Sequence, residues 1–431
     1  FNKSSDYKLS VSDVEIIQEN HKDIMFLFHV DPIGFVLVPA DNRVSPILAY
    51  SQQSSFSLNG IPDNVAYLFN QYRSKLFQLI NINSLPKQKI SNEWFKYISH
   101  EDLKLNFNSV EPLLTSQFDQ GVGWNAYCPL DSQGPGGHAL VGCLAVSMAQ
   151  IMHYWSFPSF GDGSHSYESN LYGNLEANFS SAIYNYEAMG EGKSATDAAA
   201  LLLNHIGIAI EMDYGPDVSV AYYQNAFEAF FTNFFFEELN NDWNGNMLDM
   251  DWIQSFWTSE EQYINLLKQE LDSFRPVFYY GNVPGESIGH CWNIDGYQEN
   301  EFHMNWGWGG NYNGYFRLND AAIDYTDGQG YFRNVQPLDV DKPKLLLESF
   351  NFYDRVGDMD RVINPGETIE LTTSFFIPPV FLNADSILIE LDSDEDGISF
   401  INNIQKFGEL VAGDTLNNIT SPFLIEIDSN I

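Results

Sequence analysis

The segment that most constrains the fold is Gly142–Trp155, where small and apolar residues would cover every side of a helix. Such a helix has no polar face to turn toward water, so we expect it to be buried within a domain. Gly142 allows a sharp turn into it and leaves Cys143 in the first turn. There the unpaired backbone amides and the helix dipole favour a thiolate, which a nucleophilic cysteine needs. A free cysteine is more commonly a small buried apolar residue, so this segment alone leaves both interpretations open.

The rest of the chain is long and apolar enough to build more than one core. Its 431 residues exceed one ordinary domain, and we expect two or three domains. The 44% of apolar and 15% of aromatic residues exclude a disordered chain. No apolar run approaches the roughly 18–20 residues of a membrane span, so we expect no transmembrane segment.

The charge balance limits the partners. The chain has 20 basic and 58 acidic side chains, for a formal net charge of −38. This argues against a nucleic-acid partner, because binding phosphates requires clustered Lys and Arg. A well-solvated acidic surface is the simplest explanation of the excess. The first residue is Phe1 rather than Met, and we expect an initiator or targeting peptide to have been removed.

The cysteines do not form a disulfide framework. Cys128, Cys143 and Cys291 are too few and too odd in number for one. One bridge with one free thiol, for example Cys128 with Cys291, and three free thiols both stay open. The chain has neither a His-Glu-x-x-His nor a Cys-x-x-Cys motif, so we expect no catalytic zinc and no cofactor.

Differences in texture divide the chain into three stretches, which we place at 1–106, 107–339 and 340–431. The first mixes strand and helix patterns, the second is richer in helix, and the third has short strands with little helix signal. Together they predict an α+β fold, in which a small α+β domain, a larger α+β domain and an all-β sandwich follow one another. The last expected strand runs close to Ile431, so a sandwich truncated there stays open.

Periodicity and turn residues predict the individual elements. We expect strands at 24–30, 35–38, 44–50, 275–280, 290–297, 302–306, 315–318, 345–347, 368–376, 386–391 and 423–427. We expect helices at 64–79, 194–210 and 258–273. The strands at 24–30 and 35–38 enclose a Pro/Gly turn and predict a hairpin. Ser194–Asp197 has the pattern of a capping box at the start of its helix.

Two downstream residues strengthen Cys143 as a nucleophile. His290 lies 147 residues after it, and Asn305 follows 15 residues later, which agrees with the spacing in papain-like enzymes. A turn near 298–301 would put these two on neighbouring strands, where the Asn carbonyl can accept from the imidazole and select its tautomer. Trp306 could cover that hydrogen bond. An aromatic–glycine turn is the alternative interpretation of Asn305 and Trp306.

Other polar residues near the cysteine are weaker candidates. The side-chain amide of Gln120 could join the Cys143 backbone N–H in an oxyanion hole, although a lone Gln in a loop carries no weight by itself. His138 is a rival base, but its glycine-rich loop has nothing to orient the ring, so we prefer His290. We interpret His153, on the Cys143 helix, as a core histidine with its hydrogen bonds satisfied.

Five stretches of the middle part, in this order, resemble the streptopain-like cysteine peptidases. They are 119–121, 142–143 with the Met148–Met152 helix, 212–216, 289–290 and 303–310. The resemblance implies a papain-like fold and cleavage of proteins, with a preference for an apolar side chain two residues before the scissile bond. The segment 320–330 is shorter and has fewer glycines than the family's active-site loop, so substrate specificity is not carried over.

Residue by residue, the resemblance implies that Cys143 is the nucleophile and His290 the base. Gln120 matches the family's oxyanion glutamine, Asn305 its His-orienting residue, and Trp306 the adjacent tryptophan.

Cys291 follows directly after the expected base. On a strand it would point to the face opposite that of His290, and we interpret it as a core residue.

The first stretch is similar to the propeptide of the same family, most clearly over 35–50. This implies that residues 1–106 lie against the active site as an intramolecular inhibitor until the chain is cut near 106–110. It also implies a bacterial enzyme that is secreted or associated with the cell surface and acts on protein or peptide substrates. We expect a monomer.

The acidic turns of the third stretch are weak calcium candidates. The residues concerned are Asp358, Asp360, Asp392, Asp394 and Asp396. The last three have the first half of a calcium-loop spacing, but Asn403 stands where such loops have a bidentate Glu. Both turns are more often solvated turns than metal sites. The stretch resembles immunoglobulin-like modules of secreted bacterial enzymes, which implies a role in adhesion or anchoring.

Three functions stay open. The first is the zymogen of a secreted cysteine endopeptidase, acting through a thioester acyl-enzyme and a Gln/backbone oxyanion hole. The second is a Cys–His transglutaminase or amidase, which usually has Asp at the position of Asn305. The third is a catalytically silent adhesin or binding protein, which we would expect to have lost Cys143 or His290.

Overall fold

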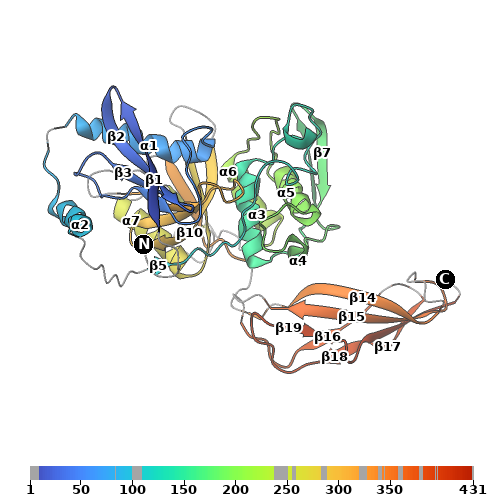
Figure 1. The fold of residues 1–431 in the computed structure, drawn as a ribbon. Helices are drawn as coiled ribbons and strands as arrows, with labels where there is room; N and C mark the ends of the chain where they lie inside the picture. The colour runs from blue at the N-terminus through green and yellow to red at the C-terminus, as the bar shows by residue number, and fades with distance from the viewer. Residues whose placement is uncertain are drawn as a thin grey trace. The chain divides into compact units, whose positions relative to one another are not determined.

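The computed structural model describes most of the chain. The described residues are 9–82, 84–99, 109–236, 251–254, 259–282, 289–319, 328–337, 342–343, 345–357, 363–377, 382–393, 395 and 397–429. The chain forms two compact units, of which one comprises Phe1–Tyr154 and Phe160–Gln336 and the other Trp155–Ser159 and Pro337–Ile431 (Figure 1). The boundary that we place between residues 106 and 107 falls inside the first unit and stays a prediction.

The first unit is an α+β structure, as predicted. Its helices are α1 (Asp63–Ile80), α2 (Gln88–Ile98), α3 (Cys143–Trp155), α4 (Tyr186–Met189), α5 (Asp197–Ala209), α6 (Tyr223–Thr232) and α7 (Glu260–Asp272). Its strands are β1 (Ser10–Glu19), β2 (Lys22–Asp31), β3 (Phe35–Pro39), β4 (Ala49–Ser51), β5 (Ser109–Val110), β6 (Ser164–Ser169), β7 (Gly173–Asn178), β8 (Asp251–Gln254), β9 (Val277–Asn282), β10 (Gly289–Gln298), β11 (Glu301–Asn305), β12 (Gly314–Arg317) and β13 (Gln329–Arg333).

One sheet joins the N-terminal stretch to the middle of the chain. Its order is β1-β2-β3-β4-β12-β11-β10-β9-β13-β8, and β5 pairs with β10. The joint is the antiparallel pair β4–β12, where Tyr50 lies opposite Tyr315 and the two rings stack with centroids 5.1 Å apart. Helices α3 to α5 and strands β6 and β7 lie together in the other half of the unit (Figure 1). The N-terminal strands therefore extend the sheet that carries His290.

Helix α1 forms because its apolar residues recur at helical spacing and face that sheet. Val65, Leu68, Tyr72 and Leu76 are at most 1% exposed. They belong to one apolar core with residues of β2, β3 and β9 to β13. Full burial of a side chain of this size stabilises a fold by roughly 1.5–3 kcal/mol, so the shared core ties β2, β3 and α1 firmly to the rest of the unit.

Most predicted elements are confirmed, and several local details are wrong; the strand expected at 345–347, for example, is Leu346–Val356. The hairpin is β2–β3, and the helix at 64–79 is α1. The strand expected at 44–50 is only Ala49–Ser51, because pairing with β3 and β12 begins at Ala49. Helix α5 is capped by Thr196 rather than Ser194, since the Thr196 hydroxyl is the one that accepts from the Ala199 amide, at 3.1 Å.

The second unit is all-β, as predicted. Its strands are β14 (Leu346–Val356), β15 (Thr368–Phe376), β16 (Leu388–Glu390), β17 (Ile398–Asn402), β18 (Ile404–Lys406), β19 (Thr415–Asn417) and β20 (Phe423–Ile427). One sheet has the order β14-β15-β20-β17, with β19 also on β15, and a second pairs β16 with β18. The bounds of β15 and β20 are those expected from the sequence.

A buried carboxylate fastens α7 to the end of the central sheet. Glu270 is 1% exposed and accepts from Arg275 at 2.7 and 3.1 Å, from Arg333 at 3.1 Å and from the Asn334 amide at 2.9 Å. Burial alone would raise the pKa of Glu270, but these donors hold it below its ordinary value.

Replacing this carboxylate should therefore be costly. We expect Glu270→Gln to lower the free energy of unfolding by about 3 kcal/mol, because two arginines lose their counter-charge inside the fold. Urea unfolding of the full chain in a Cys143→Ala background measures it. Glu261→Gln, exposed on the same helix, is the matched control and should change stability by about 0.5 kcal/mol or less. Equal effects of the two variants would contradict the assignment.

Candidate active site

Cys143 is the first residue of α3, and the turn that leads into the helix can only be made by glycine. Gly142 has φ +93°, and a Cβ there would lie 2.5 Å from the terminal methyl of Met212. The cysteine is half-buried and all three cysteines are free. The structure thus places Cys143 at a helix N-terminus, as predicted.

The segment after α5 holds the chain that approaches the cysteine. The Leu140 amide donates to the Gly215 carbonyl at 3.0 Å, and the Ser219 hydroxyl donates to the Leu140 carbonyl at 2.7 Å. Met212 also packs on Gly142, so this side chain and the two hydrogen bonds of Leu140 together fix the turn. The residues at 212–216 therefore act on the site through the backbone beside Cys143.

The surroundings of Cys143 favour its thiolate. A hydrogen bond from the Cys291 thiol is the largest influence and lowers the pKa of Cys143. Burial opposes it, and the backbone amides of Cys291, Cys143 and Leu144 lower the pKa further. The helix N-terminus thus contributes as expected from the sequence, whereas the thiol neighbour was not foreseen.

Gln120 lies beside the same turn. Gln120 is only 4% exposed, and its backbone carbonyl accepts from the Val141 amide at 3.1 Å. The preceding Phe118 amide donates to Gln150 of α3 at 3.1 Å. The loop that carries Gln120 is therefore fastened to both the start and the body of the cysteine helix.

Asn305 and Trp306 lie at the end of β11. Asn305 is 2% exposed; it donates to the Ser116 carbonyl at 2.8 Å and accepts from the Gly307 amide at 3.3 Å. Trp306 is 1% exposed and packs on Trp292, with ring centroids 5.0 Å apart. The expected neighbouring strands are confirmed, since β10 ends at Gln298, β11 begins at Glu301, and Asn293 pairs with Asn305.

His290 faces the other side of β10. Side chains alternate along a strand, and Asn293, which donates to the Ser147 carbonyl of α3 at 3.1 Å, marks the α3 face. Cys291 shares that face, so His290 and Trp292 point to the opposite one, as expected for Cys291 and His290. There both rings lie near Tyr67 of α1, with centroids 6.3 and 6.2 Å away.

Helix α1 is seated on this face through its first turn. Asn64, 2% exposed, donates to the Cys291 carbonyl at 3.1 Å and to the Trp306 carbonyl at 2.8 Å, and it accepts from Trp308 at 2.9 Å. Tyr67 lies over Gly281, where a Cβ would come within 2.4 Å of its ring. The N-terminal stretch thus contacts Cys291, which follows His290 on β10, and Gly281, which lies opposite His290 on β9.

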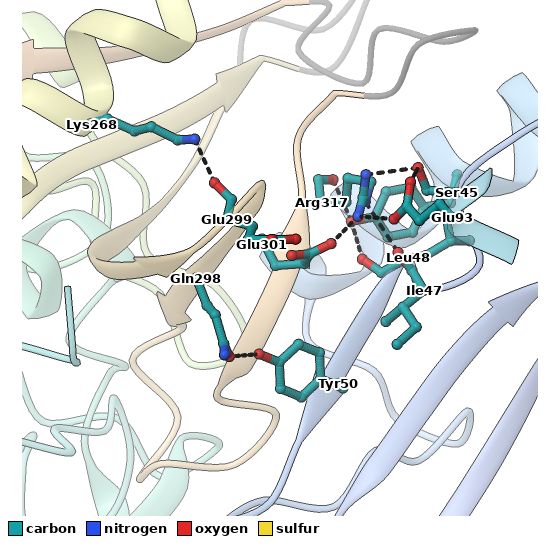
Figure 2. A network of polar contacts seen from close by, with 11 residues as sticks. Ser45, Ile47, Leu48, Tyr50, Glu93, Lys268, Gln298, Glu299, Glu301 and Arg317 are labelled. Atoms are coloured by element: carbon teal, nitrogen blue, oxygen red, sulfur yellow. Dashed lines mark hydrogen bonds and ion pairs between the residues drawn. The ribbon is translucent and has the colours of Figure 1, made fainter. Parts of the chain in front are cut away.

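A second contact area lies around Arg317 of β12 (Figure 2). The Arg317 guanidinium, from a residue 4% exposed, is paired with Glu301 and donates to Glu93 of α2 at 3.2 Å and to Ser45 at 2.8 Å. It also donates to the Ile47 carbonyl at 3.2 Å. One buried cation of the middle part is therefore enclosed mostly by groups from residues 45–93.

The remaining candidates are His138, His153 and the acidic residues of the third stretch. His138 is oriented after all, because its Nδ1 lies 2.8 Å from the Cys128 carbonyl, which corrects the expectation of an unsupported ring. His153 bonds the Gly190 carbonyl at 2.8 Å. Asp392 is exposed and accepts from the Ser393 amide. The candidates Asp358, Asp360, Asp394 and Asp396 lie outside the described residues.

Among the residues that the structure describes, no three His, Cys, Asp or Glu side chains are grouped so that they could hold a metal ion. Among the helices described, none combines the length and the apolar character needed to cross a bilayer.

The chain is similar to members of two known protein families. Residues 118–316 match the Peptidase C10 family, and residues 2–76 match the Spi protease inhibitor family. Streptopain of Streptococcus pyogenes is 29% identical over 339 residues, which are 72% of this chain and 79% of that protein. The thiol protease/hemagglutinin PrtT of Porphyromonas gingivalis is 25% identical over 332 residues, 73% of this chain but 36% of that protein.

A solved structure has the same fold. A fragment of prointerpain A from Prevotella intermedia superposes with a TM-score of 0.55 at 23% identity, over 75% of this chain and 98% of the fragment. Fold and site thus define a papain-like cysteine peptidase with an N-terminal stretch seated on it. The chain is a streptopain-like cysteine endopeptidase with a propeptide, and therefore a zymogen.

The hydrogen bonds of Asn64 allow a direct test of whether α1 keeps the enzyme inactive. We expect Asn64→Ala to speed self-processing of the purified chain, because it leaves two carbonyls and the Trp308 indole without their partner, at a cost of about 2–3 kcal/mol in docking. The rate is measured by gel densitometry. Asn70→Ala, at an exposed position of the same helix, is the control and should process like the parent chain. Equal rates for the two variants would argue that α1 does not restrain the enzyme.

The Glu301 carboxyl makes docking of the propeptide depend on pH. Burial is the main cause that raises its pKa, the charges of Glu93 and Glu299 add to it, and Arg317 opposes. Release of an N-terminal stretch that includes α2 would remove Glu93 and lessen the burial of Glu301, so the pKa of Glu301 would fall toward its ordinary value. The docked state thus binds the proton more tightly, and docking is strongest at low pH and weakens as pH rises through the raised pKa.

Acid is accordingly not expected to open the zymogen. In a Cys143→Ala chain, amide exchange of β4, corrected for its intrinsic pH dependence, should be slower at mildly acid than at neutral pH. Glu301→Gln should remove this difference. Faster opening in acid by the parent chain would show that another group controls docking.

Proposed function

We propose that the chain is the precursor of a secreted endopeptidase that hydrolyses peptide bonds through a thioester on Cys143. The observation that carries this proposal is the placement of Cys143 at the start of α3 with its pKa lowered, next to the loop of Gln120. The thiolate attacks the scissile carbonyl, the amine leaves with a proton, and water then hydrolyses the thioester.

We assign the remaining roles by chemistry. The Gln120 amide and the Cys143 backbone N–H would bind the oxyanion that forms in each step. His290 would deliver and recover the proton, oriented by Asn305, with Trp306 excluding water from that pair. Asn305 and Trp306 are both buried, and Asn305 bonds the Ser116 carbonyl in the segment that leads to Gln120, which supports this assignment.

In the zymogen His290 would be held away from its partner. Its side of β10 is occupied by Tyr67 and Asn64, whereas Cys143 and Asn305 lie toward the other side. Catalysis would require the first residues of β10 to rearrange once α1 has left. Self-inhibition would then depend on the position of the His290 imidazole, while Cys143 would already have its lowered pKa in the zymogen.

The proposed cut at 106–110 fits the contacts that follow it. The Leu113 amide donates to the Asp295 carbonyl at 2.8 Å, and the Leu114 amide donates to the Asp295 carboxylate at 3.0 Å. Strand β5 pairs Val110 with Tyr297. A cut just before these contacts frees the propeptide while the new N-terminus stays attached to β10.

The third stretch is proposed to be an immunoglobulin-like module that anchors a secreted or surface-bound bacterial enzyme. Its all-β topology supports a role outside the catalytic reaction.

Incubation of the purified chain tests the proposed reaction. We expect a new N-terminus within 106–110, determined by terminal sequencing, and no cut in Cys143→Ala, because the thiolate is the nucleophile. Casein digestion after activation should stop with an epoxide thiol trap, which should label Cys143. Cys128→Ala, at a buried thiol that hydrogen-bonds with Tyr214, is the control and should remain active.

The same experiment separates the other functions. Acyl transfer to an added amine without hydrolysis of casein would favour a transglutaminase or amidase. Activity that is indifferent to the thiol trap, or none after processing, would contradict the peptidase reaction.

A further inference from the structure

Cys291 brings a second thiol to the sulfur of Cys143. Along β10, Cys291 and Asn293 are two residues apart on the face that meets α3, and Asn293 bonds the Ser147 carbonyl at 3.1 Å. Ser147 lies one helical turn after Cys143. Two strand residues advance about 6.7 Å and four helix residues about 6 Å, so Cys291 falls opposite Cys143. The Cys291 thiol accordingly donates a hydrogen bond to the Cys143 sulfur.

The two sulfurs differ in the way that a redox pair requires. Cys143 is half-buried at the helix N-terminus and is held toward the thiolate, the form that attacks an oxidant. Cys291 is 2% exposed, and its burial raises its pKa, so it stays a thiol behind the nucleophile. An oxidant therefore meets Cys143 first and finds a resolving thiol already in contact with it.

Peptide hydrolysis uses Cys291 only through its effect on the pKa of Cys143. The reaction proposed above takes place at the Cys143 thiolate and an imidazole, and the sulfur of Cys291 is not a reactant in it. The sulfur of Cys291 becomes a reactant only when Cys143 is oxidised.

We propose that Cys143 and Cys291 form a reversible disulfide when the chain meets a peroxide. The inference rests on the proposed function only in taking Cys143 as the reactive thiolate. That thiolate attacks the peroxide and becomes a sulfenic acid, as the O–O bond breaks and the other oxygen leaves as hydroxide, which takes up the proton that the Cys143 thiol released on ionising and becomes water. Cys291 then attacks the sulfenic sulfur, its proton joins the departing hydroxyl, and a second water is released. In sum, two thiols are oxidised by two electrons and one hydrogen peroxide is reduced to two waters.

The disulfide would protect the zymogen. It links β10 to the start of α3 in the arrangement that keeps His290 toward Tyr67, and it removes the sulfenic acid before a second peroxide can convert it irreversibly to a sulfinic acid. A thiol reductant then restores both cysteines.

The test uses the full chain, freed of reductant and treated with hydrogen peroxide, and it reads thiols rather than proteolysis. In the parent chain we expect intact mass to fall by two hydrogen atoms, a peptide crosslinking Cys143 with Cys291, and complete return of both thiols with a reductant. In Cys291→Ala we expect Cys143 to gain two oxygen atoms and to stay unreactive after reduction. Cys291→Ser, which keeps size and hydrogen bonding, should behave like Cys291→Ala, while Cys128→Ala should behave like the parent chain.

The proposal is overturned if the parent chain and both Cys291 variants gain oxygen at the same rate without recovery, or if the crosslink contains Cys128. Casein digestion by reduced, processed enzyme is scored separately. Its loss would count against the peptidase reaction and leave the thiol result readable.

Discussion

The alternation of side chains along β10 is the constraint on which the site depends. A strand presents successive residues to opposite faces, so His290 and Cys291 cannot both meet the cysteine helix while the strand keeps its pairing with β9. In this structure Cys291 takes the place next to Cys143, and the imidazole lies toward α1. A Cys143 thiol with a lowered pKa and an imidazole on the opposite face of β10 therefore coexist in one folded chain. With the roles proposed above, latency needs no distortion of α3.

The propeptide maintains this arrangement by becoming part of the fold. Strand β4 extends the sheet beyond β12, Tyr67 fills the space above Gly281, and Asn64 bonds the carbonyls that follow His290 and precede Gly307. Removing it would expose an apolar core surface and take Glu93 and Ser45 away from Arg317. Those costs oppose spontaneous undocking of an uncut propeptide, because buried contacts and intact strand pairing would be lost. A cut in the connecting chain is therefore the expected trigger of activation.

Much of this was accessible from sequence, since long periodic or spaced patterns reflect local physics. The helix after Gly142, the strands around His290 and Asn305, and α1 were expected with nearly the observed bounds. Strand β1 was missed because much of it is exposed, and its apolar residues are too few for clear alternation. The face to which His290 points was not predictable either, because it depends on which partner strand β10 registers with and on a helix 210 or more residues earlier in the chain.

Two polar residues interrupt apolar patterns of the sequence and so indicate buried contacts. Asn64 lies four and eight residues before Leu68 and Tyr72, so it interrupts the apolar stripe of α1 at a position that must be buried. Arg317 stands within an apolar strand and is likewise buried. A polar group in such a place requires partners from elsewhere, because leaving it unpaired costs more than the burial of its neighbours returns. Both residues prove to join the propeptide to the peptidase, which suggests that unexplained buried polar residues in a zymogen mark the contacts that keep it inactive.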